Sequence, residues 1–513
     1  MTGMFLAALE ATVIATAMPT VIASLGGMEH FSWVFSAYLL ASTVTVPIWG
    51  KLSDVYGRRP LYQAGIAVFL VGSVLSGLSQ SMTQLIIFRA IQGLGAGALI
   101  PLGMTIIGDI FTLRERAKMQ AFLSGVWGLA SIIGPLIGGF LTDQLSWRWV
   151  FYINLPFGIA AAVIMGLALV EPKPHEKPVI DYAGATALTA AVSLLMLVLV
   201  EAGTFAELLR PRNVLLLAAS GILLFFFLRI ERRARDPIVP LQLFRNPVVS
   251  VAVIAGFLSG VAMFGAITFI PLFAQGARGA TATEAGSLLT PLMLSWVAMS
   301  IVGGRLVLRV GFKSLVLTGL IVLTLSFAWF ATFGRDTPRT VLLIDLCLIG
   351  FGLGLTMLTL LLAVQQSVPR AQLGISTSLN QFSRSIGGAI GVAIMGALLT
   401  AGFTPAAARI AGGTPLLRGD RSAAEALIDP EMRSQIAPVT LMQLQDALAD
   451  SLRSVFLMGA IFSGIAFLVA LRLPVISTQS IPHPESPADS GERAVMAEMT
   501  TIDAEHEPVC VEE

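Results

Sequence analysis

The chain has 513 residues, of which 55% are hydrophobic and only 12% are charged, whereas soluble domains are roughly 25% charged. Together with a mean hydropathy of +0.83, this composition excludes a soluble globular protein. The formal net charge of +1 gives no support to nucleic-acid binding, which requires a basic surface. Cys347 lies in an apolar run and Cys510 in a polar tail, so the sequence offers no disulfide framework.

Fourteen apolar runs along the chain are long enough to cross a bilayer, since a membrane helix needs about 20 mostly apolar residues. The sequence therefore predicts an all-α polytopic membrane protein embedded in the lipid bilayer. In chain order, the predicted spans are residues 2–22, 33–50, 61–79, 83–107, 119–141, 149–170, 182–201, 213–230, 248–274, 285–304, 314–333, 340–363, 376–401 and 454–472.

The basic residues set the predicted orientation, because Lys and Arg near span ends stay on the cytoplasmic side. The short loops after even-numbered spans hold 17 Lys and Arg, and those after odd-numbered spans hold 6. We therefore expect both termini to be cytoplasmic, which requires an even number of spans. The long segment 402–453 is left out of this count and is predicted to be an external loop with one short amphipathic turn.

Short patterns recur at nearly constant offsets in the two halves of the chain. Gly50-Lys51-Leu52 and Gly57 match Gly304-Arg305-Leu306 and Gly311 at an offset of 254, and Gly93, Gly95 and Gly97 match Gly350, Gly352 and Gly354 at 257. Internal repeats are common in transporters, which bind substrate between the halves near the bilayer midplane.

The repeat predicts four parts of the chain. Residues 1–170 form one six-helix bundle and residues 248–472 form a second. Residues 171–247 hold a linker and two inserted spans, which we expect to pack at the periphery and not to line a pore. The tail 473–513 is acidic and rich in proline, so it cannot bury a core and is predicted to be disordered and cytoplasmic.

Four charged residues lie well inside predicted spans: Glu10, Arg89, Asp345 and Arg384. A charge at the bilayer centre costs about 2.5–3.5 kcal/mol on insertion scales, so each needs a reason. Glu10 lies near the midplane of its span. A nearby cation lowers the pKa of a buried carboxyl, and desolvation raises it. Our hypothesis makes Glu10 a proton carrier modulated by Arg89, and the alternative is a fixed ion pair.

The other two intramembrane charges and one glycine pattern permit more than one interpretation. Asp345 lies nearer the outer mouth, where a structural role is favoured slightly. Arg384 is expected either to face a cavity or to bond helix carbonyls. In the fifth span, Ala130, Gly134 and Gly138 share one face that allows close helix packing, and Pro135 bends the helix. This combination suits a hinge between halves, with tight packing alone as the alternative.

At these residues the chain resembles the major facilitator superfamily, and within it the fourteen-span drug:proton antiporter family of the EmrB/QacA type. The matching segments are the loop Gly50-Lys51-Leu52-Ser53-Asp54-Val55-Tyr56-Gly57-Arg58-Arg59-Pro60, Arg89-Ala90-Ile91-Gln92-Gly93, Gly134-Pro135-Leu136-Ile137-Gly138-Gly139, Leu9-Glu10-Ala11-Thr12-Val13, Trp147 to Pro156, Pro271 to Gln275 with Gly279 and Gly286, and Arg384 to Gly388. Val55 replaces a common base, and Glu10 stands where the family usually has Asp.

The resemblance implies two six-helix bundles plus two extra central spans. It also implies a cytoplasmic signature loop formed by Gly50, Asp54, Gly57, Arg58 and Arg59, a proton-coupling role for Arg89, and an antiporter motif at Gly134, Pro135, Gly138 and Gly139. In physical terms, Asp54 can bridge to Arg58 or Arg59 or cap a helix N-terminus, which would latch one conformation.

The sequence thus predicts a proton-coupled exporter of amphipathic or cationic small molecules in a plasma membrane, which fits a bacterium best. An exporter of one endogenous compound, such as a lipid, siderophore or amino acid, is the alternative. The histidines lie in loops and the tail, so we expect no metal site, no catalytic site and no enzyme. No phosphate-binding Gly-x-x-x-x-Gly-Lys-Ser/Thr run occurs, so we do not expect ATP to be the direct energy source. We also expect no cofactor and no obligate protein partner.

Overall fold

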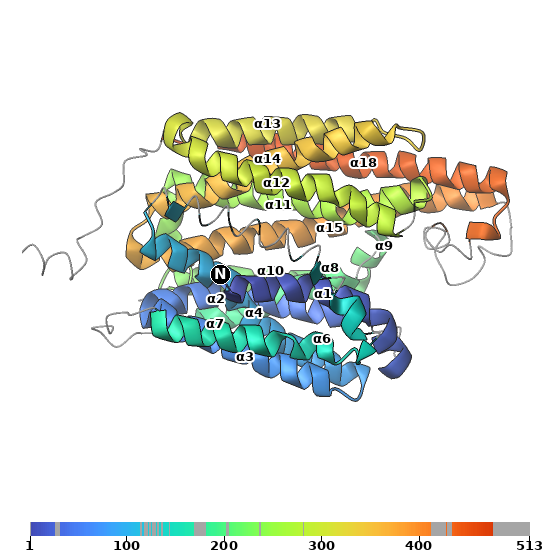
Figure 1. Cartoon of the computed structure of the whole chain (residues 1–513). Helices are drawn as coiled ribbons and strands as arrows, with labels where there is room; N and C mark the ends of the chain where they lie inside the picture. The colour runs from blue at the N-terminus through green and yellow to red at the C-terminus, as the bar shows by residue number, and fades with distance from the viewer. Residues whose placement is uncertain are drawn as a thin grey trace, which may run out of the picture. The chain divides into compact units, whose positions relative to one another are not determined.

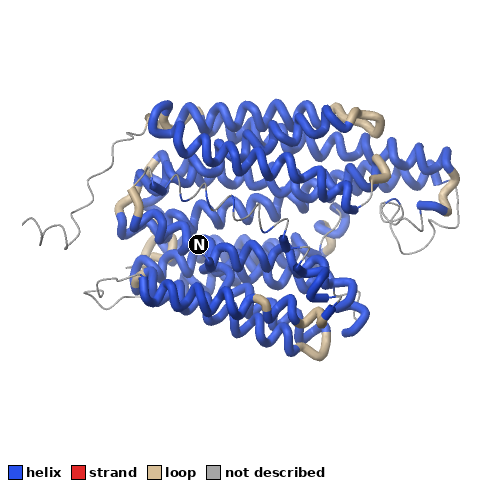
Figure 2. Tube along the Cα trace, in the orientation of Figure 1, coloured by secondary structure: helices blue, strands red, loops and turns tan. Residues whose placement is uncertain are grey.

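The computed structural model describes residues 2–25, 31–112, 144–168, 181–201, 205–234, 237–280, 282–411 and 433–475, with residue 427 and short runs between 115 and 142. Every regular element among these residues is helical (Figure 2), because a helix pairs its own backbone N–H and C=O groups in lipid. The elements are α1 (Thr2–Leu25), α2 (Phe31–Tyr56), α3 (Arg58–Leu78), α4 (Met82–Ile110), α6 (Trp149–Tyr152), α7 (Asn154–Ala168), α8 (Tyr182–Glu201), α9 (Phe205–Leu208), α10 (Pro211–Glu231), η2 (Leu241–Arg245), α11 (Pro247–Leu272), η3 (Phe273–Ala277), α12 (Ala282–Val310), α13 (Phe312–Phe330), α14 (Arg339–Ser367), η4 (Arg370–Gln372), α15 (Leu373–Ala411) and α18 (Pro438–Ala470).

Twelve helical segments in the described part are long and apolar enough to cross a membrane. They correspond to predicted spans 2–4 and 6–14. The predicted first span coincides with the 24-residue helix α1, which is not among the twelve. The predicted fifth span, 119–141, falls largely outside the described residues. The structure therefore shows a polytopic helical membrane protein without establishing the count of fourteen.

The helices form two groups that meet at α15. Figure 1 shows α1–α4, α6 and α7 packed together and α11–α15 and α18 packed together, and α15 contacts α2 and α4 across the boundary. Of the two inserted helices, α10 exposes many large apolar side chains, whereas α8 packs on both α2 and α15. The boundary between the two groups is therefore formed by α2 and α4 on one side and by α15 on the other.

The glycines of the predicted repeat make matching contacts in the two groups. A side chain at Gly95 would overlap α3, and one at Gly352 would overlap α13. The glycines two residues to either side of each, at positions 93, 97, 350 and 354, approach α2 or α12 in the same way. Glycine permits such close helix approach because it has no side chain. The two halves therefore share one packing scheme.

The two loop glycines of the repeat also adopt the same backbone conformation. Gly57 joins α2 to α3 with φ 95° and ψ 156°, and Gly311 joins α12 to α13 with φ 82° and ψ 166°. Essentially only glycine populates this region of φ and ψ. Each glycine thus permits a sharp reversal directly after a long helix.

Helix occupies both ends of the segment predicted to be an external loop, and here the structure differs from the prediction. α15 has 39 residues and continues to Ala411, and α18 begins at Pro438. Leu444, Leu448 and Leu452 of α18 are buried at a helical spacing. These extensions contain no continuous apolar run, because their buried residues recur at helical spacing with polar residues between them.

Candidate functional site

A polar cluster is buried where α1, α4 and α7 meet. The carboxylate of Glu10 pairs with the guanidinium of Arg89 and accepts a hydrogen bond from Nδ2 of Asn154. Glu10 and Arg89 are each 2% exposed and Asn154 is 0% exposed. The two charges predicted to form a coupling pair are therefore in direct contact, away from water.

Arg89 has neutral partners besides Glu10. Its NH1 group donates to Oε1 of Gln92 at 2.6 Å, and its Nε donates to the carbonyl oxygen of Val34 at 3.3 Å. The guanidinium carbon lies 4.2 Å from the centre of the Tyr38 ring, a geometry that attracts a cation to the ring face. Arg89 is therefore held in place by several groups besides the carboxylate of Glu10.

Ser73 of α3 joins the two sides of the cluster. Its hydroxyl oxygen accepts from Asn154 at 2.9 Å and from Nε2 of Gln92 at 3.3 Å. The hydroxyl donates to the carbonyl oxygen of Phe151 at 2.8 Å. We call Glu10, Ser73, Arg89, Gln92 and Asn154 the buried cluster. A continuous set of hydrogen bonds thus connects four helices of the first group.

A second ionic network lies at the predicted cytoplasmic end of α2, α3 and α4. Arg58 donates to Oδ1 of Asp54 and to Oδ2 of Asp109, each at 2.7 Å, and to the carbonyl oxygen of Ser53 at 2.9 Å. Arg58 begins α3 directly after Gly57, so the sharp reversal at this glycine places the guanidinium between the two carboxylates.

The same network also bonds to the second group of helices, at Arg370 and the start of α15. The Asp54 carboxylate accepts from the backbone N–H of Gly374 at 2.9 Å and of Ile375 at 2.8 Å, in the first turn of α15. Arg370 pairs with Asp109 at 3.1 Å, and its carbonyl oxygen accepts from Arg58 at 3.0 Å. A helix N-terminus attracts a carboxylate. We call Asp54, Arg58, Asp109, Arg370 and the N–H groups of residues 374 and 375 the latch.

The other two residues of the signature loop lie beside the latch. A side chain at Gly50 would overlap Ser378 and the backbone of Gly374, so glycine lets α2 approach α15 closely. Arg59 is half-buried in the first turn of α3. The structure thus brings Gly50, Asp54 and Arg58 into contact between the halves.

Asp109, near the end of α4, lies among three guanidiniums. Besides Arg58 and Arg370, the buried Arg116 lies nearby and donates to the carbonyl oxygen of Phe111 at 2.7 Å. Burial lowers the pKa of Arg116, Asp109 raises it and Arg370 lowers it. Asp109 is therefore a buried bridge between the two halves.

The predicted antiporter motif is only partly described. Ala130, Gly134 and Gly138 are buried and Gly139 is half-buried, while Pro135 lies outside the described residues. A side chain built at Gly139 would meet nothing within 4 Å. The predicted hinge therefore stays a prediction.

Asp345 and Arg384 lie in the second group and do not join the buried cluster. Asp345 is 0% exposed and accepts a hydrogen bond from the Ser326 hydroxyl at 2.6 Å, while its other oxygen is buried and has no hydrogen-bond partner among the described residues. Within the same part of the chain, Arg384 contacts side chains and not helix carbonyls: its NH2 donates to Oε1 of Gln381, and its NH1 lies 3.7 Å from Sδ of Met357.

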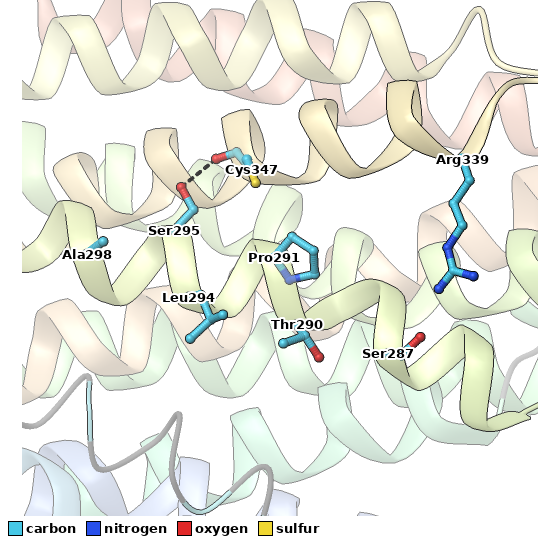
Figure 3. A pocket seen from close by; sticks show the side chains of 8 residues that line it. All are labelled: Ser287, Thr290, Pro291, Leu294, Ser295, Ala298, Arg339 and Cys347. Atoms are coloured by element: carbon cyan, nitrogen blue, oxygen red, sulfur yellow. Dashed lines mark hydrogen bonds between the residues drawn. The ribbon is translucent and has the colours of Figure 1, made fainter.

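A hollow of about 640 Å³ opens between the N-terminal halves of α12 and α14. Figure 3 shows Arg339 and Ser287 at one end, Ala298 at the other, and the Ser295 hydroxyl donating to the Cys347 carbonyl oxygen at 2.6 Å. Its wall mixes apolar side chains with small hydroxyl groups. No cluster of three or more His, Cys, Asp or Glu that could hold a metal occurs in the described part of the chain.

Sequence reasoning did not single out the neutral members of the buried cluster. Asn154 and Ser73 are polar residues within apolar runs, and a buried polar group needs a hydrogen-bond partner. That signal could have marked both as partners of a nearby charge.

A sequence profile of the Major Facilitator Superfamily matches residues 1–392. The chain belongs to the major facilitator superfamily. It is 38% identical to a multidrug transporter protein, MdtP, of Bacillus subtilis (strain 168), over 92% of each chain. It is 36% identical to multidrug resistance protein 3 of the same organism, over 90% of this chain and 91% of that protein. The protein is therefore a membrane transporter of this superfamily and not an enzyme, and both of these relatives are named for multidrug transport or resistance.

Solved structures with low sequence identity share the fold. A human organic anion transporter superposes with a TM-score of 0.62 at 14% identity, covering 91% of this chain and 97% of that one. A proton:xylose symporter gives 0.60 at 12% identity, covering 94% and 95%. The major facilitator fold is therefore shown for the described helices.

Proposed function

We propose that the protein is a proton-coupled antiporter that exports amphipathic or cationic small molecules by alternating access. The observation that carries this proposal is the buried cluster. A carboxylate paired with a cation inside a membrane bundle is a typical proton-relay arrangement. When Glu10 takes up a proton, Arg89 loses its ionic partner but keeps Gln92 and Val34, so the cluster can hold two charge states without losing its cation.

The latch supports the alternating-access part of the proposal. It joins the two halves at one end through Asp54, which accepts two N–H bonds from α15. Transport then requires a state in which these bonds are broken and the cytoplasmic end opens. Protonation of Glu10 on α1 and opening beside α2 and α4 are coupled through α4, which carries both Arg89 and Asp109.

The proton gradient is a sufficient energy source for export. Moving one charge across a membrane potential supplies about 2.3 kcal/mol per 100 mV. That energy supports a substrate gradient of roughly fifty-fold per charge, because 1.4 kcal/mol is tenfold.

The proposal includes fourteen spans with both termini cytoplasmic, in a bacterial plasma membrane. Twelve candidate spans occur in the described residues, α1 supplies a further long helix, and the apolar segment 119–141 would supply the last. The excess of basic residues in the loops after even-numbered spans supports this orientation.

Replacing Glu10 by Gln tests the coupling. The amide keeps the size of the side chain but cannot lose a proton, so we expect Glu10→Gln to abolish pH-driven dye transport in inverted vesicles while the protein still reaches the membrane. Glu207→Gln, at a surface pair with Arg210, is the control and should transport normally. Transport by Glu10→Gln at the wild-type rate would exclude Glu10 as the proton carrier.

A further inference from the structure

Arg384 differs from Arg58 and Arg89 in its partners. Glu10 pairs with Arg89, and the carboxylate of Asp54 pairs with Arg58. In the described part of the chain no carboxylate lies within ion-pair distance of Arg384. Its partners are the amide oxygen of Gln381 and the thioether sulfur of Met357, which are both neutral. An arginine inside a helical bundle usually has an anionic partner, and the residues that the structure describes supply none for Arg384.

The guanidinium has unused hydrogen-bonding capacity. It carries five N–H donors in a planar fork, and two of its nitrogens are used here, one of them on a weak sulfur acceptor at 3.7 Å. The planar fork matches the two oxygens of a carboxylate or phosphate. Arg384 is also half-buried and not fully enclosed, so an entering anion can reach it.

The position of Arg384 suits a transported molecule. It lies eleven residues into α15, or about 16 Å at 1.5 Å per residue, which is about half the thickness of a bilayer core. Met357 is three residues along α14 from Gly354, which packs against Met299 of α12, next to Ala298 at the inner end of the hollow. Met357, and with it the guanidinium, thus lies about one helical turn along α14 beyond the end of the hollow at Ala298, outside its lining residues.

We propose that Arg384 binds an anionic group of the transported molecule, so that the substrates include amphipathic acids carrying a carboxylate, sulfonate or phosphate. This inference rests on the proposed export function and narrows its substrate class. The anion takes the place of the Met357 sulfur on the guanidinium, and the apolar part of the molecule lies toward the hollow. Gln381 positions the fork by holding NH2.

Two dyes with the same ring system test the assignment. Fluorescein carries a carboxylate, and rhodamine 6G is a cationic ester. Binding of each dye to the purified full-length protein in nanodiscs is measured by fluorescence anisotropy. We expect Arg384→Gln to weaken fluorescein binding roughly tenfold or more, because a charge-assisted pair is lost, and to change rhodamine 6G binding by less than about threefold.

Two further variants separate binding from folding. Gln381→Glu keeps the guanidinium but gives it an internal carboxylate, so it should weaken fluorescein binding about as much as Arg384→Gln. Met357→Leu conserves volume and should leave both dyes bound within roughly twofold. These two variants still test the anion site if the Arg384→Gln protein does not fold.

The outcomes distinguish the anion site from the export function. Absence of fluorescein binding to the wild type, or an equal loss of both dyes in Arg384→Gln and Gln381→Glu, overturns the anion site. Rhodamine 6G transport driven by a pH gradient, without fluorescein binding, rejects the anion site and leaves the export function standing. Fluorescein binding that depends on Arg384, without pH-driven transport of either dye, supports the site and rejects the function.

Discussion

Replacing Asp54 by Asn removes the charge at the centre of the latch while keeping the shape of the side chain. In the native protein the carboxylate pairs with Arg58 at 2.7 Å and accepts two backbone N–H bonds from α15, at 2.9 and 2.8 Å. The side-chain amide in the Asp54→Asn variant has one acceptor oxygen, so it can keep one of these N–H bonds. The other N–H bond and the ion pair are lost.

The size of the effect follows from the lost contacts. A hydrogen bond to a charged group contributes about 1.5–3 kcal/mol, and the position of a carboxylate at a helix N-terminus adds about 0.3–1 kcal/mol. We therefore expect the cytoplasm-closed state to lose about 2–4 kcal/mol, or roughly 30- to 700-fold in its equilibrium constant. A closed state favoured tenfold in the wild type would fall to about a quarter of the population or less.

Cys347 provides a reporter for this shift, because it is exposed in the wall of the hollow. With Cys510 replaced by Ser, a membrane-impermeant maleimide added from outside should label Cys347 several-fold more slowly in Asp54→Asn than in the parent. Glu115→Gln is the matched control, since the exposed Glu115 only caps the Thr112 N–H and hydroxyl, which Gln also does. Equal labelling rates in Asp54→Asn and the parent would refute the role of the latch.

Two predictions concern stability and are read from thermal unfolding in detergent. Gly57→Ala and Gly311→Ala should each lower the free energy of unfolding by about 1–3 kcal/mol, because alanine is strained at these φ and ψ values. Gly221→Ala is the control and should not lower it, because the space around Gly221 is open. Unchanged melting temperatures in both loop variants would contradict this prediction. Ser326→Ala removes the hydroxyl that donates to Asp345 and should lower the free energy of unfolding by about 1–3 kcal/mol, whereas Asp345→Asn should lower it by less. The reverse order of the two variants would contradict the assigned hydrogen bond.

The sequence was sufficient to predict the charged members of the buried cluster. Glu10 and Arg89 are expensive inside a membrane, so their presence in apolar runs indicates a pair. Asn154 and Ser73 carry no charge, and many such residues in spans only bond to their own helix. Only the fold shows that Asn154 donates to Glu10 and that Ser73 joins Asn154 to Gln92.

The latch was predictable only on one side of the boundary. Asp54 and Arg58 stand four residues apart, so their contact is local. The partners on α15 are backbone N–H groups at residues 374 and 375, and every residue except proline has such a group. No side-chain pattern distinguishes these two positions, so the contact between the halves required the structure.

The inserted helix α8 has a consequence for molecules dissolved in the bilayer. Leu188 and Val192 of α8 pack with Val44 of α2 and Leu379 of α15, one from each half. On this side, apolar side chains of α8 therefore cover part of the join between the two groups of helices. We expect α8 to obstruct the entry of a compound that diffuses laterally in the lipid toward this part of the join.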